Sequence, residues 1–102
     1  AKGYFNYLLE NHPDSKQVPS AHMYLGNYYL KDSQYNKAAE HFQQIIEEHP
    51  NYNEIKTAAL NLLKTFKEME LYEKGRKVAE YINNRWPQIH LKHESVLSLW
   101  FL

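Results

Sequence analysis

The chain has 102 residues, of which 43% are hydrophobic and 24% charged, and its twelve basic and twelve acidic side chains cancel. This length suits a single domain with one hydrophobic core. The charge balance argues against a nucleic-acid-binding surface, which normally carries a basic excess. Because the chain lacks cysteine, it has no disulfide, thiolate metal ligand or cysteine nucleophile.

No stretch approaches the roughly 20 consecutive apolar residues that span a bilayer, so a soluble protein is expected, either periplasmic or cytoplasmic. The chain starts at Ala1 rather than at methionine and ends on the apolar residues 99–102. Such ends are typical of a processed protein or of a segment of a longer one.

The first predicted helix carries apolar residues at helical spacing, Tyr4, Phe5, Leu8 and Leu9. It is expected to end near His12, because a proline disfavours helical geometry in the residue before it. The next helix is expected to start at Ser15 or close to Pro19 and to be apolar around much of its surface, as suits a helix packed on both flanks.

The second helix of this hairpin follows, with Asp32 or Ser33 as the expected N-cap. Its apolar stripe is Tyr35, Ala38, Ala39, Phe42, Ile45 and Ile46. The short connection implies that the two helices are antiparallel. A capping box of Asn51 and Glu54 is then expected to open another helix, whose partner runs from about Tyr72 to Trp86.

Three prolines, Pro13, Pro50 and Pro87, are spaced at intervals of 37 residues, which indicates an internal repeat. The predicted layout of the single domain is the second helix of a repeat (1–13), two full repeats (14–50 and 51–87) and the first helix of a further repeat (88–102). About six helices are expected in all. The residues after each proline are expected to lengthen the first helix of the next repeat by most of a turn.

The middle copy carries Leu25-Gly26-x2-Tyr29, then Ala38-x3-Phe42, then Pro50. It resembles the tetratricopeptide repeat, whose pattern is W-x2-L-G-x2-Y, A-x3-F and P, with His22 in the tryptophan position. This resemblance implies an all-α, right-handed α-solenoid of antiparallel helix pairs that acts as a protein-interaction scaffold or adaptor. Gly26 and Ala38 should let two helices approach closely, with Phe42 filling the space beside them.

The 37-residue period is also similar to repeats of bacterial envelope proteins, of the outer-membrane assembly lipoprotein and Tol-Pal coordinator types, which slightly favours the periplasm. Adding 37 maps Gly26 onto Leu63, Ala38 onto Gly75 and Phe42 onto Ala79. Since cores conserve total volume, Leu63 is expected to pack over Gly75.

The resemblance implies that the first helix of each repeat lines a concave groove for a peptide or partner protein. The groove residues expected are Ser20, Met23, Tyr24, Asn27 and Lys31, then Thr57, Leu60, Asn61, Lys64 and Glu68, followed by Leu97 and Ser98. Related proteins clamp a terminal carboxylate with two asparagines and three cations. Here both asparagines remain, but the cation positions hold Met23, Glu94 and Ser98, so no clamp is expected. The alternative is that the two asparagines are only solvated and that the groove binds no partner.

The helical halves at the two ends of the chain predict a possible homo-oligomer. Trp100 and Phe101 of one molecule would pack against Phe5 of the next and continue the solenoid.

The six histidines do not predict a metal site. His12 and His49 share one repeat position, and His90 and His93 have only Glu94 nearby. His22 is expected to be a half-buried packing residue, and no nucleophile with a neighbouring base is evident. We therefore expect no enzyme and no catalytic, cofactor or metal site.

Most of the aromatic residues, nine of which are tyrosines, are expected at packing positions in the core rather than as a stacking platform for bases. An RNA-binding helical-repeat module stays an alternative function, although Lys31, Lys64 and Lys67 make only a thin basic groove.

Overall fold

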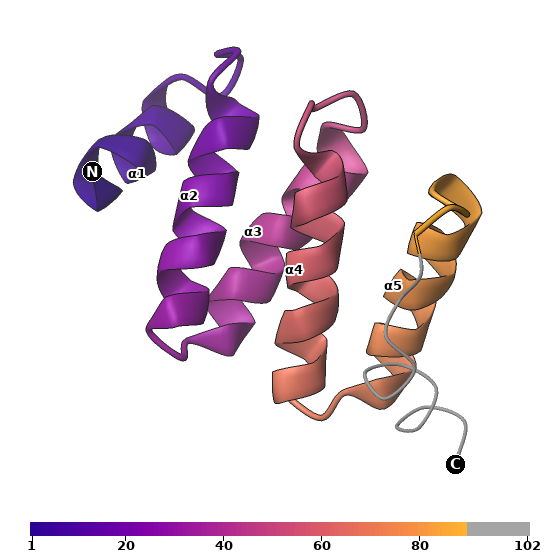
Figure 1. Ribbon diagram of the computed structural model, residues 1–102. Helices are drawn as coiled ribbons and strands as arrows, with labels where there is room; N and C mark the ends of the chain where they lie inside the picture. The colour runs from indigo at the N-terminus through magenta and orange to yellow at the C-terminus, as the bar shows by residue number, and fades with distance from the viewer. Residues whose placement is uncertain (90–102) are drawn as a thin grey trace.

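The computed structural model describes residues 1–89, which form five α-helices and no strand (Figure 1). The helices are α1 (Lys2–Asn11), α2 (Val18–Lys31), α3 (Tyr35–Glu48), α4 (Ile55–Glu68) and α5 (Tyr72–Arg85). Each packs on the next, and α2 also contacts α4. The predicted all-α class is confirmed. The expected sixth helix, over 88–102, lies almost entirely outside the described residues.

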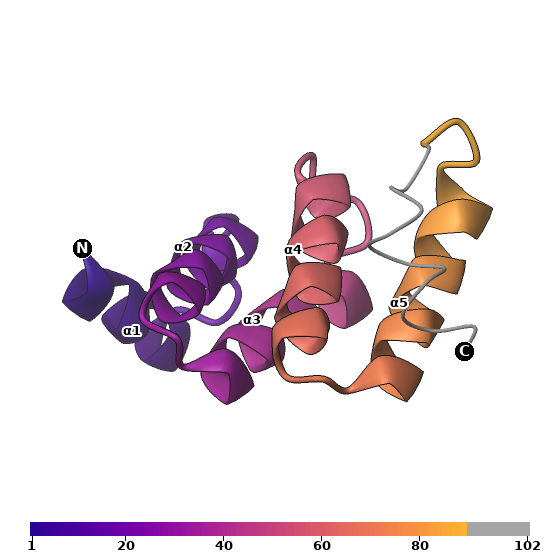
Figure 2. The ribbon, with the colours of Figure 1, turned by 60° about the horizontal axis from the view of Figure 1, so that its bottom comes forward.

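The helices follow one another along an elongated body with extents of 44 × 27 × 17 Å (Figures 1 and 2). Within residues 1–89, no helix has both the length and the apolar character needed to cross a bilayer.

The loops that follow α1 and α3 share one hydrogen-bond pattern, which begins again after α5. In each, the backbone N–H of the residue before the proline donates to the carbonyl oxygen four residues earlier, at 2.8–2.9 Å. The N–H three residues later donates to the carbonyl oxygen of the residue before the proline, at 3.0 Å. The residues before the proline are His12, His49 and Trp86. The 37-residue period of the sequence is therefore also a period of the backbone.

The residues after each proline form turns, at 14–17 and 51–54, and do not lengthen the following helix. Helices α2, α3, α4 and α5 all have 14 residues, so the expected extension of the first helix is wrong. The expected capping box is also wrong, because α4 begins at Ile55 after Glu54 and has no side-chain cap.

The turn within each repeat is closed by the backbone. After α2, Ser33 N–H donates to Leu30 O and Gln34 N–H donates to Tyr29 O, a Schellman motif in which Ser33 has a φ of 60°. After α4 the same two bonds form around Glu70, which has a φ of 58°. The N-cap of α3 is Gln34, so the prediction of Asp32 or Ser33 is wrong. Those residues instead close the preceding helix.

Replacing Glu70 with glycine is expected to raise the free energy of unfolding by about 0.5–1 kcal/mol. A residue with a Cβ atom destabilises the folded state by about 1–2 kcal/mol when its backbone is left-handed. This exceeds the stability that is lost because glycine raises the conformational entropy of the unfolded chain. Urea denaturation measures the change. Glu80→Gly, at an exposed position inside α5, is the control and should lower stability by about 1 kcal/mol. A loss of stability in Glu70→Gly would contradict this account of the turn.

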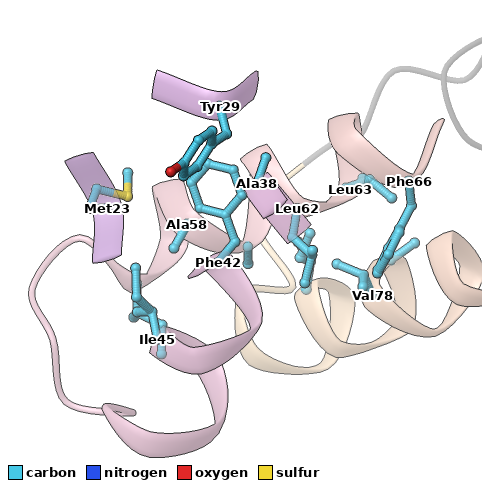
Figure 3. Close-up of a cluster of buried hydrophobic side chains, with 14 of the residues drawn as sticks. Met23, Tyr29, Ala38, Phe42, Ile45, Ala58, Leu62, Leu63, Phe66 and Val78 are labelled. Atoms are coloured by element: carbon cyan, nitrogen blue, oxygen red, sulfur yellow. The ribbon is translucent and has the colours of Figure 1, made fainter. Parts of the chain in front are cut away.

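The core is one continuous cluster to which α2, α3, α4 and α5 all contribute (Figure 3). Its largest fully buried side chains are Phe42, Leu25, Ile45, Leu62, Ile82 and Thr65. The i, i+3, i+4, i+7 stripes of α3 and α4 supply most of it, as an amphipathic helix should.

Gly26 lies where the ring of Phe42 packs against α2. A Cβ atom at this position would lie 2.6 Å from Phe42 Cε1 and 2.8 Å from Cζ, closer than atoms can approach. The predicted tight packing of Gly26 and Phe42 is confirmed. In the next repeat Gly75 and Ala79 are buried, and Leu63 belongs to the core, but the packing of Leu63 over Gly75 stays a prediction.

The tyrosines are less buried than expected. Of the nine, Tyr29 is buried, whereas Tyr4, Tyr7, Tyr24, Tyr28 and Tyr72 are 38–56% exposed. The expectation that the aromatic residues lie mainly in the core is therefore wrong for these five tyrosines. The physical reason is visible at Tyr28 and Tyr29, because consecutive residues point to different sides of a helix and only one of them can face the core.

Candidate functional site

The residues predicted to line the groove lie on α2 and α4, the one pair of non-consecutive helices in contact within residues 1–89 (Figures 1 and 2). On α2, Ser20, Tyr24, Asn27 and Lys31 are exposed at intervals of three and four residues. On α4, Lys64 is exposed, whereas Leu60 and Asn61 are half-buried. We call these seven side chains the α2/α4 surface.

Met23 differs from the other predicted groove residues. Its side chain is only 7% exposed and belongs to the core cluster, so it offers little to a partner. Its neighbour Tyr24, 38% exposed, lies at the surface instead. Of the remaining predicted residues, Thr57 and Glu68 are exposed on α4, whereas Leu97 and Ser98 lie outside the described residues.

Two side-chain amides join α2 and α4 across this surface. Asn61 Nδ2 donates a hydrogen bond of 2.9 Å to Asn27 Oδ1. The backbone beneath Asn61 is also held, because the buried Thr65 hydroxyl donates to Asn61 O at 2.7 Å. The two asparagines that the sequence placed in one groove are therefore brought together.

A hollow adjoins the amide pair. It is lined by Asn27, Leu30, Lys31, Tyr35, Lys64 and Glu68. A second hollow shares Lys64 and Glu68 with it and adds Leu60, Leu63 and Lys67. The lining thus mixes apolar contact area with three lysines and one glutamate. Among the described residues the one ion pair joins Arg76 to Glu73, so the lysines of the hollow are not neutralised by a salt bridge there.

Phe5, predicted to make an end-to-end contact, is half-buried by its own chain. Its ring packs on Tyr24 at a centroid distance of 4.7 Å and on Tyr4 at 5.2 Å. Tyr4 is tied in turn to the loop, since its hydroxyl donates to Gln17 Oε1 at 3.0 Å. Trp100 and Phe101 lie outside the described residues, so the contact stays a prediction.

Histidines from α2 and α3 form a cluster that sequence reasoning missed. The Nδ1 atoms of His22 and His41 are 3.0 Å apart, and the rings of His22 and His49 have a centroid distance of 6.2 Å. Tyr29 stacks on His41 with an interplanar angle of 11°. His22 is half-buried, as predicted, but as part of a hydrogen-bonded pair.

The surroundings keep this pair neutral. Burial, with further contributions from the charges of His41 and His49, lowers the pKa of His22 to about 4. Burial also lowers the pKa of His41, although the charge of Glu40 acts in the opposite direction. At neutral pH, one imidazole can therefore donate its Nδ1 proton to the Nδ1 lone pair of the other.

The sequence carries only a partial signal for this contact, because it places both histidines near the contact between α2 and α3 without specifying how the two helices are aligned. His22 lies one helical turn before Gly26, and His41 is next to Phe42. Gly26 and Phe42 mark the contact between α2 and α3, so both histidines lie close to it.

Together, these features define a protein of consecutively packed helical hairpins whose exposed first helices carry a polar surface. Residues 19–52, which contain α3 and all but the first residue of α2, match the family model of the tetratricopeptide repeat. The family is a non-catalytic repeat scaffold that binds proteins or peptides. Comparisons with curated proteins and with solved structures found no match.

Proposed function

We propose that the chain binds a peptide segment of a partner protein along the α2/α4 surface and serves as a scaffold or adaptor in a multi-protein assembly. The observation that carries this proposal is the hydrogen bond between Asn27 and Asn61. It orients one amide of each helix, and it leaves Asn27 Nδ2 and Asn61 Oδ1 without another partner among the described residues. A peptide group presents both a donor and an acceptor, so it complements this pair.

The surroundings of the amide pair favour a partner segment with apolar and acidic side chains. Leu60 and Tyr24 offer apolar contact area, and Lys31 and Lys64 offer positive charge beside it. A terminal carboxylate clamp has no support, because Met23, in one of the three cation positions, is a buried apolar residue. A net charge of zero and the small number of lysines, three around the two hollows, also give RNA binding little support.

The setting of the assembly is inferred from the repeat length. The backbone pattern of the loops recurs with the 37-residue period that is similar to that of envelope repeat proteins. We therefore place the proposed assembly in a bacterial envelope, on that similarity alone.

The test starts with capture of partners from a native extract by the wild-type chain and by an Asn27→Ala/Asn61→Ala double variant. Peptides from a captured protein are then titrated by calorimetry. We expect the double variant to bind roughly 10-fold to 100-fold more weakly, since it loses two hydrogen bonds of about 1 kcal/mol each.

Gln44→Ala is the matched control, because it removes an exposed amide from α3, away from the proposed surface. It should bind like the wild type. Equal binding by the wild-type and double-variant chains would contradict the proposal. So would a chain that binds no peptide but binds oligonucleotides with an affinity that falls steeply as the salt concentration rises.

A further inference from the structure

The paired imidazoles of His22 and His41 form a second candidate site that the proposed peptide surface does not use. His22 extends from the first half of α2 and His41 from the middle of α3, so the pair bridges the two antiparallel helices of the hairpin (Figure 1). The ring centroids are 5.2 Å apart. The Tyr29 ring stacked on His41 limits how far that imidazole can turn.

The separation of the two nitrogen atoms matches that of neighbouring ligands on a metal ion. Two imidazole nitrogens, each about 2.0–2.1 Å from a metal, are ~2.9 Å apart when they subtend a right angle and ~3.4 Å apart in a tetrahedral site. The observed distance between His22 Nδ1 and His41 Nδ1 is 3.0 Å. The separation therefore matches that of adjacent ligands on a square-planar or tetragonal ion, the arrangement that Cu²⁺ and Ni²⁺ prefer with nitrogen ligands. The rings must turn from their hydrogen-bonded orientation for both lone pairs to converge on the ion.

The chemistry of the pair is also suitable. Burial keeps both rings neutral at pH 7, and a neutral imidazole is the form that binds a metal. The carboxylate of Glu40 acts on His41 and would favour a cation nearby. No group of three or more ligating side chains with metal-binding geometry occurs within residues 1–89, so the pair would supply two ligands and leave the other positions to water.

We propose that His22 and His41 form a two-histidine site for a divalent transition-metal ion of the Cu²⁺ or Ni²⁺ type, which fastens α2 to α3. On binding, the proton shared by the two Nδ1 atoms moves to the Nε2 atom of the ring that carried it. Both rings remain neutral, and both Nδ1 lone pairs point at the metal. No net proton is released at neutral pH.

The test uses Cu²⁺ and a background chain in which the histidines outside the His22/His41/His49 cluster are removed, with His12→Gln, His90→Gln and His93→Gln. Electron paramagnetic resonance of this chain with one equivalent of Cu²⁺ should show a tetragonal ion with two imidazole nitrogen ligands. The thermal unfolding midpoint should rise as the Cu²⁺ concentration increases, because binding to the folded state alone stabilises it.

Two further variants, His22→Gln and His41→Gln, are made singly in the same background, and circular dichroism checks that each is folded. Each should weaken Cu²⁺ binding by about tenfold or more, because each removes one of two protein ligands. His49→Gln is the control and should retain the two-nitrogen spectrum.

Equal affinity in all of these variants would overturn the proposal and identify adventitious binding, for example at the terminal amine. A one-nitrogen spectrum in the background chain would also overturn it, and this readout does not depend on whether a His22 or His41 variant folds.

Discussion

The Phe42→Ala variant is expected to lose about 3–5 kcal/mol of its free energy of unfolding, the largest effect of any single substitution that we predict. The ring of Phe42 is fully buried in α3 and packs directly against α2 at Gly26. Its removal leaves a cavity at the centre of a cluster shared by four helices, and helices in contact on several sides cannot all collapse into it. Urea denaturation followed by circular dichroism measures the loss.

Gly26→Ala is expected to be coupled to this residue. In an ordinary helix the substitution would stabilise by about 1 kcal/mol, but here the added methyl group meets the Phe42 ring, and overpacking costs about 1–3 kcal/mol. In a Phe42→Leu background, with a smaller side chain at the contact, the cost should fall or change sign. The double-mutant cycle should therefore give a coupling energy above about 0.5 kcal/mol.

Gly3→Ala provides the matched control, since nothing lies within 4 Å of a Cβ at that position in α1. It should be neutral or stabilising in both backgrounds. A Gly26→Ala variant that gains stability to the same extent as Gly3→Ala would contradict the close packing of Gly26 and Phe42.

The helices themselves could be predicted from the sequence because their apolar residues recur with the period of an α-helix. The ends of α1 and α5 fall where the prolines at 13 and 87 place them, and the short connection correctly predicted the antiparallel hairpin of α2 and α3 (Figure 1). The repeat also brought Asn27 and Asn61 into one predicted groove, and these residues are hydrogen-bonded in the structure.

What the sequence could not supply depends on backbone geometry and on the register between helices. The caps expected at Ser33 and Asn51 fail because α3 and α4 begin later, after Gln34 and Glu54, neither of which forms a side-chain cap, and Ser33 adopts a left-handed conformation with no glycine to indicate it. The contact between His22 and His41 depends on how far α3 slides along α2, which the separation of 19 residues along the chain does not specify.

Lowering the pH from 7 to about 4.5 is expected to destabilise the metal-free protein through His22. The folded state lowers the pKa of His22 from 6.5 to about 4, so between these values the unfolded chain binds more protons. Stability therefore falls as the pH drops through this window, and it is independent of His22 above it. One pKa unit corresponds to ~1.4 kcal/mol, and solvent screening at a half-buried ring reduces the total to about 1–2 kcal/mol.

The measurement is the free energy of unfolding as a function of pH with a chelator present, for the wild type and for His22→Gln. Contributions from other groups are common to both chains, so the expected result is a steeper loss in the wild type, not a loss alone. His12→Gln removes an exposed histidine and should retain the wild-type slope. Parallel curves for the wild type and His22→Gln would contradict the prediction. They would mean that His22 accepts a proton in the folded hairpin as readily as in the unfolded chain, despite the repulsion expected from His41 and His49.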